Sequence, residues 1–378
     1  MEWANDMLRE GISIGKAFGI PLRLHYSWFI VFVLITWSLA YNFVHAYPHW
    51  SLVHSIVVGV ITSLLFFGSV LAHELSHSIV AKAAGIPIQS INLFIFGGVS
   101  QLVEEPKQPQ VEFRMALAGP LTSLVLGGIF LAIWYWLGDM PEFIKAMCFW
   151  LGWINIALAA FNLIPGFPLD GGRVLRSLLW WQSQDLRKAT RIASNIGRGI
   201  GYLLIFIGIA FIFFGDWISG LWLAFIGWFL SNAAASSYRQ LVRQDILKGH
   251  RVSELMIRDC STVPPQVTIQ QLVNDQIMTS GHRCFPVVQD DRVLGLITIH
   301  NVKGVPREQW PAKTVGEVMT PFANLKSVRP DEDLVTVLKI LTEQNINQLP
   351  VVDDGKIVGI ITRESLFSFI SVRSELGT

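Results

Sequence analysis

The sequence Leu64-Leu-Phe-Phe-Gly-Ser-Val-Leu-Ala-His73-Glu-Leu-Ser-His77 decides how this chain must fold. It lies near the end of an apolar run over residues 53–80. A helix of about 20 apolar residues is long enough to cross the hydrocarbon core of a bilayer. Ionisable side chains inside such a helix are costly and rare, so His73, Glu74 and His77 together indicate a functional site.

The composition indicates that lipid covers much of the chain. Of its 378 residues, 52% are hydrophobic and 15% are charged, and the mean hydropathy is +0.46. An average soluble domain carries about 25% charged residues. We therefore predict a polytopic α-helical membrane protein, and the net charge of +1 gives no case for nucleic-acid binding. Six apolar runs qualify as spans, at roughly residues 26–43, 53–80, 114–137, 143–165, 199–214 and 218–236.

The distribution of lysine and arginine predicts the orientation. The loops at 44–52, 138–142 and 215–217 contain neither residue. The N-terminal segment and the loops after the second and fourth spans are basic, since they carry Arg9, Lys16, Arg23, Lys82, Lys107, Arg173, Arg176, Arg187, Lys188, Arg191 and Arg198. Because basic residues collect on the cytoplasmic side, we expect a multi-pass protein of the cell membrane with both termini in the cytoplasm.

The chain beyond Tyr238 has a different character. Short β-rich runs alternate with helical patterns, as in a soluble α/β module. The module repeats itself, because residues 285–298 match residues 349–362 at 7 of 14 positions. Asp290-Asp291 and Asp354-Gly355 are expected to form its hairpin turns. The predicted domains are a segment 1–24 with possible β-strands, a membrane domain 25–238, a basic linker 239–251, and a pair of repeats at 252–310 and 311–372 within 252–378.

The HExxH pattern at residues 73–77 predicts a metal site. Residues four apart share one face of a helix, so His73 and His77 can offer both imidazoles to one zinc ion. Glu74 is placed beside them to accept a proton from water at the metal. The alternative is that His73 and His77 bind no metal, but their position within an apolar helix argues against it.

A catalytic zinc site needs a third protein ligand, and Asp170 is the candidate. The second and fourth spans both run inward, so their ends reach a similar depth. The fourth span ends in Asn162-Leu-Ile-Pro-Gly-Phe-Pro-Leu-Asp170-Gly-Gly172, where the prolines break the helix. A plain helix stop, with Asp170 capping the next helix, is the alternative.

A β-hairpin is expected directly after the metal-binding helix. Asn92–Phe96 and Val99–Val103 are β-rich and flank Gly97-Gly98, which we predict to be a two-residue turn. An exposed edge of this hairpin could add an unwound substrate as a further strand, so Phe96, Gly97 and Gly98 are candidate substrate-binding residues. A loop that only packs is the alternative. The partly alternating stretch Ser13–Leu24 could pair with the hairpin.

These motifs resemble the site-2 protease family of intramembrane zinc metallopeptidases. The resemblance rests on HExxH in an early span together with the later run Asn162-Leu-Ile-Pro-Gly-Phe-Pro-Leu-Asp-Gly171, which is similar to the family's N-x-x-P-x-P-x-x-D-G motif, and it covers nearly the whole chain. It implies that His73, His77 and Asp170 bind one zinc ion per chain and that Glu74 is the general base. It further implies that Asn162 lines the substrate channel. Residues 118–123, Ala-Gly-Pro-Leu-Thr-Ser, resemble a further motif of this family.

The C-terminal repeats resemble a tandem pair of CBS domains, which implies a regulatory or dimerisation module. Such pairs often hold adenine nucleotides through a G-x-x-[ST]-x-x-D run. Here Asn301 and Ser365 stand where the aspartates are expected. A nucleotide sensor and a module for homodimerisation or docking both remain open.

The function predicted from these residues is hydrolysis of a peptide bond within or near the transmembrane segment of a single-pass membrane protein. CBS pairs also occur in divalent-metal transporters, and a transporter is the alternative function. The two differ in the role of Glu74, because a protease needs a general base whereas a transporter must pass metal across the membrane. A catalytically silent receptor is a third possibility, which the intact metal motif opposes.

Overall fold

The structure is a computed structural model that describes residues 11–95, 97–102, 104–136, 140–258, 260–290, 292–344 and 346–376. The chain divides into two compact units, Met1–Arg239 and Gln240–Thr378, which are treated separately below. Phe96 lies outside the described residues, as do Asp291 and the first ten residues.

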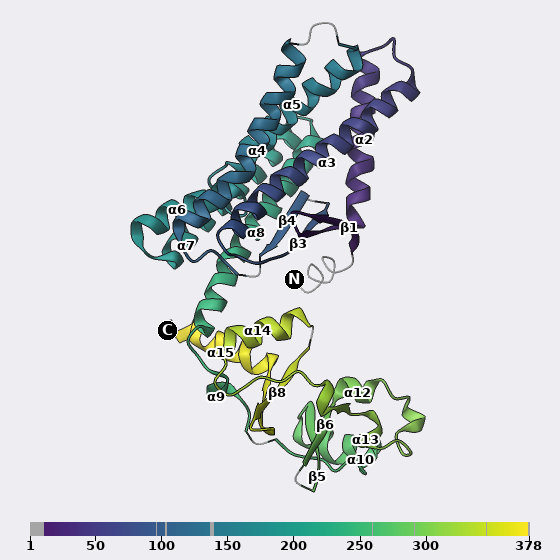
Figure 1. The fold of residues 1–378 in the computed structure, drawn as a ribbon, viewed down its shortest axis with the longest axis vertical. Coiled ribbons are helices and arrows are strands. Elements are labelled where there is room, and N and C mark those ends of the chain that lie inside the picture. Colours follow the sequence, from purple (N-terminus) through teal and green to yellow (C-terminus); the bar gives the residue numbers. More distant parts are fainter. Residues whose placement is uncertain are drawn as a thin grey trace. The chain divides into compact units, whose positions relative to one another are not determined.

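The first unit is built of long helices (Figure 1). Six helices in the described chain are long and apolar enough to cross a membrane, in agreement with the predicted fold class. The intervening helix α6 has only 14 residues and does not qualify as a span. The spans are α2 (Ser27–Ala46), α3 (Leu52–Ala83), α4 (Pro109–Trp136), α5 (Glu142–Asn162), α7 (Leu186–Phe213) and α8 (Trp217–Leu247), with α6 at Asp170–Ser183 between α5 and α7.

The outer surface of these helices is strongly apolar. Phe206 is 72% exposed, Trp222 is 63% exposed and Trp228 is 56% exposed. A soluble monomer rarely exposes such large contiguous apolar patches. This surface therefore fits a lipid environment.

Glycines let neighbouring helices approach closely. A Cβ at Gly201 of α7 would lie 2.7 Å from the carbonyl oxygen of Gly227 on α8, and a Cβ at Gly208 would lie 2.6 Å from the carbonyl oxygen of Gly220. Small residues drive this kind of packing in membranes, where burial of apolar area gives helices no advantage over lipid contact.

A four-stranded sheet accompanies the helices. Its order is β1 (Gly11–Ala17), β2 (Ile20–His25), β3 (Ile88–Phe94) and β4 (Gly97–Leu102). The N-terminal strand β2 pairs in parallel with β3, which confirms the expected pairing of the N-terminal stretch with the hairpin. The strands β3 and β4 both contact α3, so the sheet lies against the helix that carries His73.

The predicted Gly97-Gly98 turn is wrong. Phe94 pairs with Gly97 and Leu93 pairs with Gly98, so both glycines lie on β4. The physical reason is steric: a Cβ at Gly98 would overlap with the side chain of Glu74. Gly98 is needed because the strand passes close to the helix, and not because the chain reverses there.

The second unit contains two similar halves. In each half an antiparallel pair of strands packs on short helices, and the turn at Asp354-Gly355 is present. Its main elements are α9 (Val252–Leu255), α10 (Ile269–Gln271), β5 (Cys284–Gln289), β6 (Arg292–Thr298), α12 (Ile299–Lys303), α13 (Val315–Val318), β7 (Thr320–Pro321), α14 (Leu334–Glu343), β8 (Gln348–Asp353), β9 (Lys356–Thr362) and α15 (Arg363–Leu376).

The two halves exchange their leading segments. Val252, at the start of the first repeat, is buried in the core formed by the second repeat. Val315, at the start of the second repeat, is buried in the core of the first. Residues 240–247, expected to belong to a linker, continue α8 instead, and Ile246 and Leu247 are buried in the core of the second half.

The close contact of α7 with α8 makes a prediction about stability. Replacing Gly201 with Val should lower the stability of the detergent-solubilised protein by about 1–3 kcal/mol, because the added methyl groups overpack the helix contact. The matched control is Gly199→Val on the same helix, where a Cβ meets nothing within 4 Å. Thermal unfolding curves of both variants measure the difference, and equal melting temperatures would contradict the packing.

Candidate metal centre

The helix α3 presents His73 and His77 on one face, and α4 supports both rings. The Nδ1 atom of His73 lies 2.9 Å from Ser123 Oγ, and Nδ1 of His77 lies 2.6 Å from the carbonyl oxygen of Met115. Both Nε2 atoms therefore point away from α4's hydrogen-bonding groups and toward each other, 3.2 Å apart. A metal-binding histidine is commonly oriented in this way through its other ring nitrogen.

Asp170 reaches the histidines because the chain breaks between α5 and α6. The helix α5 ends at Asn162, and α6 begins at Asp170. Gly171 and Gly172 allow α6 to start directly against this loop, since a Cβ at either position would overlap with the backbone at Leu163 or Gly166. Asp170 does not cap α6, because Leu169 occupies the N-cap position without a side-chain hydrogen bond. Its carboxylate is turned to the imidazoles instead.

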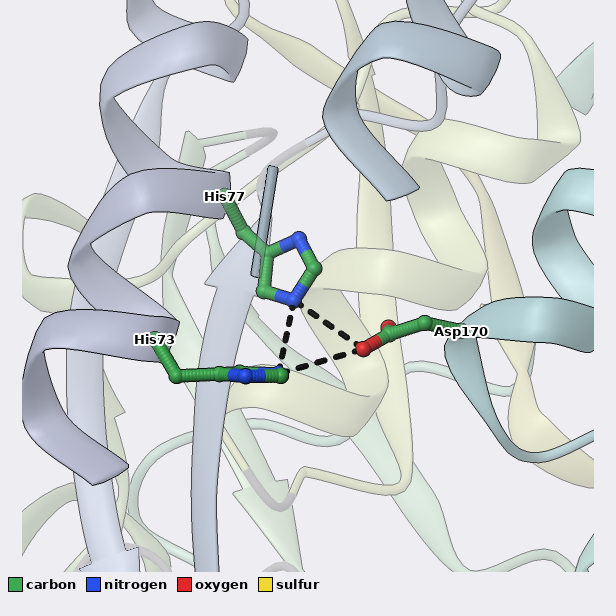
Figure 2. Close-up of side chains that lie close together, drawn as sticks. All are labelled: His73, His77 and Asp170. Atoms are coloured by element: carbon green, nitrogen blue, oxygen red, sulfur yellow. Dashed lines mark hydrogen bonds and ion pairs between the residues drawn. The ribbon is translucent and has the colours of Figure 1, made fainter. Parts of the chain in front are cut away.

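Figure 2 shows the three side chains converging from α3 and α6. The Oδ2 atom of Asp170 lies 3.2 Å from Nε2 of His73 and 3.2 Å from Nε2 of His77. Burial opposes ionisation of Asp170, but hydrogen bonding to the two imidazoles outweighs it and holds the pKa of Asp170 below its ordinary value.

The arrangement fits a zinc ion. Tetrahedral zinc with ligands at about 2.0–2.1 Å places its ligand atoms about 3.3 Å apart. The three observed separations are all 3.2 Å, and the ligands are two imidazole nitrogens and one carboxylate oxygen. Among the described residues, these three form the one cluster of His, Cys, Asp and Glu close enough to hold an ion. Gly119 of α4 leaves the space open, because a Cβ there would overlap with both Nε2 atoms.

Glu74 lies between the metal cluster and the sheet. Its Oε2 atom accepts a hydrogen bond of 3.0 Å from Ser100 Oγ on β4. Ser100 also lies 3.0 Å from Ser78 Oγ, so β4 is fixed to α3 at the residue that follows each histidine. A carboxylate oriented by a neighbouring hydroxyl and adjacent to a metal cluster is suited to accept and return a proton.

The structure brings together His73, His77 and Asp170, with Glu74 beside them. Gly98 contacts Glu74 and Gly97 precedes it on β4, whereas Phe96 lies outside the described residues. Asn162 is half-buried at the end of α5 and donates a hydrogen bond of 3.0 Å to the carbonyl oxygen of Leu158.

Two supporting groups carry no signal in the sequence. The carbonyl of Met115 has no sequence signature, because every residue carries one. Ser100 lies on a strand whose position relative to Glu74 depends on tertiary packing. Ser123 belongs to the 118–123 motif, but its contact with His73 was not predicted.

Comparison with known proteins supports a metallopeptidase. The model of Peptidase family M50 matches residues 61–139 and 138–208, and the CBS domain model matches residues 252–307 and 315–372. The protein sll0528 of Synechocystis is 36% identical over 366 residues, which cover 96% of each chain. Rip3 of Mycobacterium tuberculosis is 32% identical over 375 residues, or 97% of this chain and 94% of that protein.

Both relatives are named as zinc metalloproteases. A solved structure of the site-2 protease from Methanocaldococcus jannaschii is 30% identical, covers 61% of this chain and 95% of that chain, and gives a TM-score of 0.43.

The fold and the matches together define a multi-pass membrane zinc metallopeptidase with a C-terminal CBS pair. The chain belongs to Peptidase family M50, in the group of site-2 protease-like enzymes that carry CBS domains. The family assignment confirms the resemblance found in the sequence and removes the support for a metal transporter.

The close approach of Gly119 to the Nε2 atoms of His73 and His77 allows the metal centre to be tested. Gly119→Ala should reduce the zinc content of the purified protein by about 10-fold or more, because the methyl group displaces both imidazoles from their common position. The control is Gly128→Ala on the same helix, where a Cβ meets nothing within 4 Å. Atomic emission measurements of zinc per chain distinguish the two variants, and a full zinc complement in Gly119→Ala would count against this site.

Proposed function

We propose that this protein is an intramembrane protease in which His73, His77 and Asp170 hold one zinc ion per chain and Glu74 is the general base. The observation that carries this proposal is the triangle of ligand atoms, each 3.2 Å from the other two, with Glu74 next to His73 in the chain. Structural zinc sites use four protein ligands, whereas three leave a position for water or substrate.

Each side chain has a separate task in peptide hydrolysis. Bound zinc supplies Lewis-acid activation of water and of the peptide carbonyl at neutral pH. Glu74 accepts the proton from the attacking water and later delivers it to the leaving amine. Ser100 holds the carboxylate of Glu74 in place through its hydroxyl. Ser123 and the Met115 carbonyl keep the imidazoles in the orientation that directs Nε2 at the ion.

The proposed substrate is a transmembrane segment of a single-pass protein. A helical substrate must unwind before one of its carbonyls is accessible, and an unwound backbone needs hydrogen-bonding partners in the membrane. The strand β4 is at the edge of the sheet order β1-β2-β3-β4, so among the residues that the structure describes one side of it has no strand partner. A substrate added there would lie along the strand that carries Gly98 and Ser100, both of which contact Glu74.

Two further residues complete the proposed substrate path. Gly97 has a φ of 118° and begins β4 in a conformation that favours glycine. Asn162, half-buried at the end of α5, is proposed to line the channel from the side of the loop that leads to Asp170.

The proposed location is the cell membrane, with both termini in the cytoplasm. The support is the basic character of the segments between α3 and α4 and around the start of α7, which contrasts with the outer loops. In this orientation the end of α3 that carries His73 and His77 lies near the cytoplasmic side. A short polar path would then bring water to the site.

The general base provides the test of this function. Glu74→Gln should lower cleavage of a co-expressed tagged single-pass protein by about 10²–10⁴-fold, since the amide cannot accept the proton. The zinc content should stay unchanged because Glu74 is not a ligand. Glu104→Gln makes the same chemical change on an exposed loop residue and should cleave normally. Retained cleavage by Glu74→Gln would exclude Glu74 as the base, and metal flux into liposomes without any product would favour a transporter.

We also propose that the CBS unit binds an adenine nucleotide and regulates the protease. A cavity of about 540 Å³ lies in this unit, lined by residues of both repeats that include Ile257, Thr362 and Arg363. Thr362 belongs to the run that contacts ribose in nucleotide-binding pairs. Ser365, in place of the usual aspartate, accepts a hydrogen bond from the Thr362 backbone N–H, and its own backbone N–H donates to Thr362 Oγ1 at the start of α15. Burial raises the pKa of Cys284 at the cavity to about 12, with a further contribution from Cys260, so its thiol stays neutral.

The CBS unit is further proposed to join two chains. The helix α15 leaves Phe367 43% exposed and Val372 53% exposed. These exposed apolar side chains are the support for contact with a second copy of the same unit.

A titration tests whether the CBS unit binds an adenine nucleotide. ATP or AMP added to the full-length protein should give binding heat, and Ile257→Trp should abolish it because the indole fills the cavity. Leu325→Trp, at a position outside the residues that line the cavity, is the control and should bind normally. The absence of heat and of a thermal shift at millimolar nucleotide would leave dimerisation or docking as the role of the unit.

A further inference from the structure

A buried arginine lies close to the metal centre and has no role in the proposed chemistry. Arg176, on α6, is 6% exposed, and its Nε donates a hydrogen bond of 2.6 Å to Oε1 of Glu112 on α4. A second guanidinium nitrogen also contacts this oxygen. Glu112 is fully buried, at 0% exposure. The pair connects the helix that begins with Asp170 to the helix that supports both histidines.

Stability alone does not explain this pair. Burying two charges costs desolvation energy that their attraction often fails to recover, and apolar residues of similar volume can replace such pairs without loss of stability. An ion pair differs from apolar contacts in that its geometry is directional, because the planar guanidinium fixes both distance and angle. The pair is therefore suited to define the position of α6 relative to α4.

The position of Glu112 on α4 strengthens this reasoning. Met115 follows Glu112 by three residues, Gly119 by seven and Ser123 by eleven, so all four share one helix face. Met115 and Ser123 orient His77 and His73, and Gly119 leaves space for their Nε2 atoms. The same face thus holds two ligands directly and contacts α6, which carries the third.

Arg176 also contacts the two segments that flank the site. Its guanidinium lies 5.1 Å from the ring centroid of Phe167, in the loop that precedes Asp170. A third nitrogen lies 3.5 Å from Oε2 of Glu105, in the segment that follows β4. The arginine therefore holds the loop before Asp170, the start of α4 and the segment after the proposed substrate strand in one cluster.

We propose that Arg176 is a positioning residue that, through Glu112, sets α6 so that Asp170 completes the metal centre. This inference rests on the proposed ligand roles of His73, His77 and Asp170. It assigns to Arg176 no contact with substrate or metal. Its effect is on the distance between the Asp170 carboxylate and the two imidazoles.

The experiment uses the full-length protein in detergent and three measurements. Zinc affinity is obtained by competition with a chelating dye, the ligand geometry from the visible absorption spectrum of the Co²⁺-substituted protein, and stability from thermal unfolding. The variants are Arg176→Lys, which keeps the charge but loses the planar fork, and the double variant Arg176→Met/Glu112→Leu, which replaces the pair by apolar side chains. Arg173→Lys makes the conservative change on the same helix and is the matched control.

A positioning role separates zinc binding from stability. Arg176→Lys should weaken zinc binding by about 10–100-fold, as loss of supporting contacts around a metal site does. The double variant should melt at or above the wild-type temperature, yet still bind zinc weakly and give an altered Co²⁺ spectrum. Arg173→Lys should bind zinc within about twofold of the wild type.

Two results would overturn the inference. Wild-type zinc affinity and Co²⁺ spectrum in a double variant that folds would show that the pair only stabilises the fold. If the double variant does not fold, wild-type zinc affinity in Arg176→Lys would equally reject a positioning role. Asp170→Ala distinguishes failure of the positioning role of Arg176 from failure of the proposed ligand roles. Unchanged zinc binding in Asp170→Ala would reject the ligand set itself.

Discussion

The close approach of α4 to the two imidazoles is the constraint on which the membrane unit depends. Gly119 provides the space, and Met115 and Ser123, about one turn to either side, provide the hydrogen-bonding atoms. Two histidines on one helix can adopt many rotamers, but partners at both Nδ1 atoms leave one orientation for each ring. Contacts between α3 and α4 therefore fix the orientation of two of the three proposed ligands.

The position of Asp170, the third proposed ligand, depends on a break in the helical structure. An unpaired backbone is tolerated at membrane depth only where protein or water satisfies it. Here the loop between α5 and α6 is enclosed by neighbouring segments, since Phe167 N donates to the Ala193 carbonyl of α7 and glycines at 171, 172 and 197 allow backbone to pack on backbone. The backbone at the start of α6, which carries Asp170, is thereby protected from lipid.

The sequence was sufficient for those parts of the site that follow a local period. The spacing of His73 and His77 is a helix repeat, and Asp170 follows from the proline break that ends the fourth span. The sequence was not sufficient to predict contacts between segments that are far apart in the chain. The glycine pair at 97–98 has the composition of a turn, yet contact with Glu74 places it on a strand. The exchange of Val252 and Val315 between the two CBS halves likewise depends on tertiary pairing, which a repeat pattern does not encode.

The same limit applies to the segment after the last span. Its basic residues gave it the composition of a linker, but residues 240–247 continue α8, and two of their apolar side chains are buried in a core. Ala234 of α8 packs with Phe167 and Ala193 beside the loop that leads to Asp170. Further along the same helix, Ile246 and Leu247 belong to the core of the second CBS half. The helix α8 therefore contributes side chains to the packing of both units, a role that the composition of its last residues did not reveal.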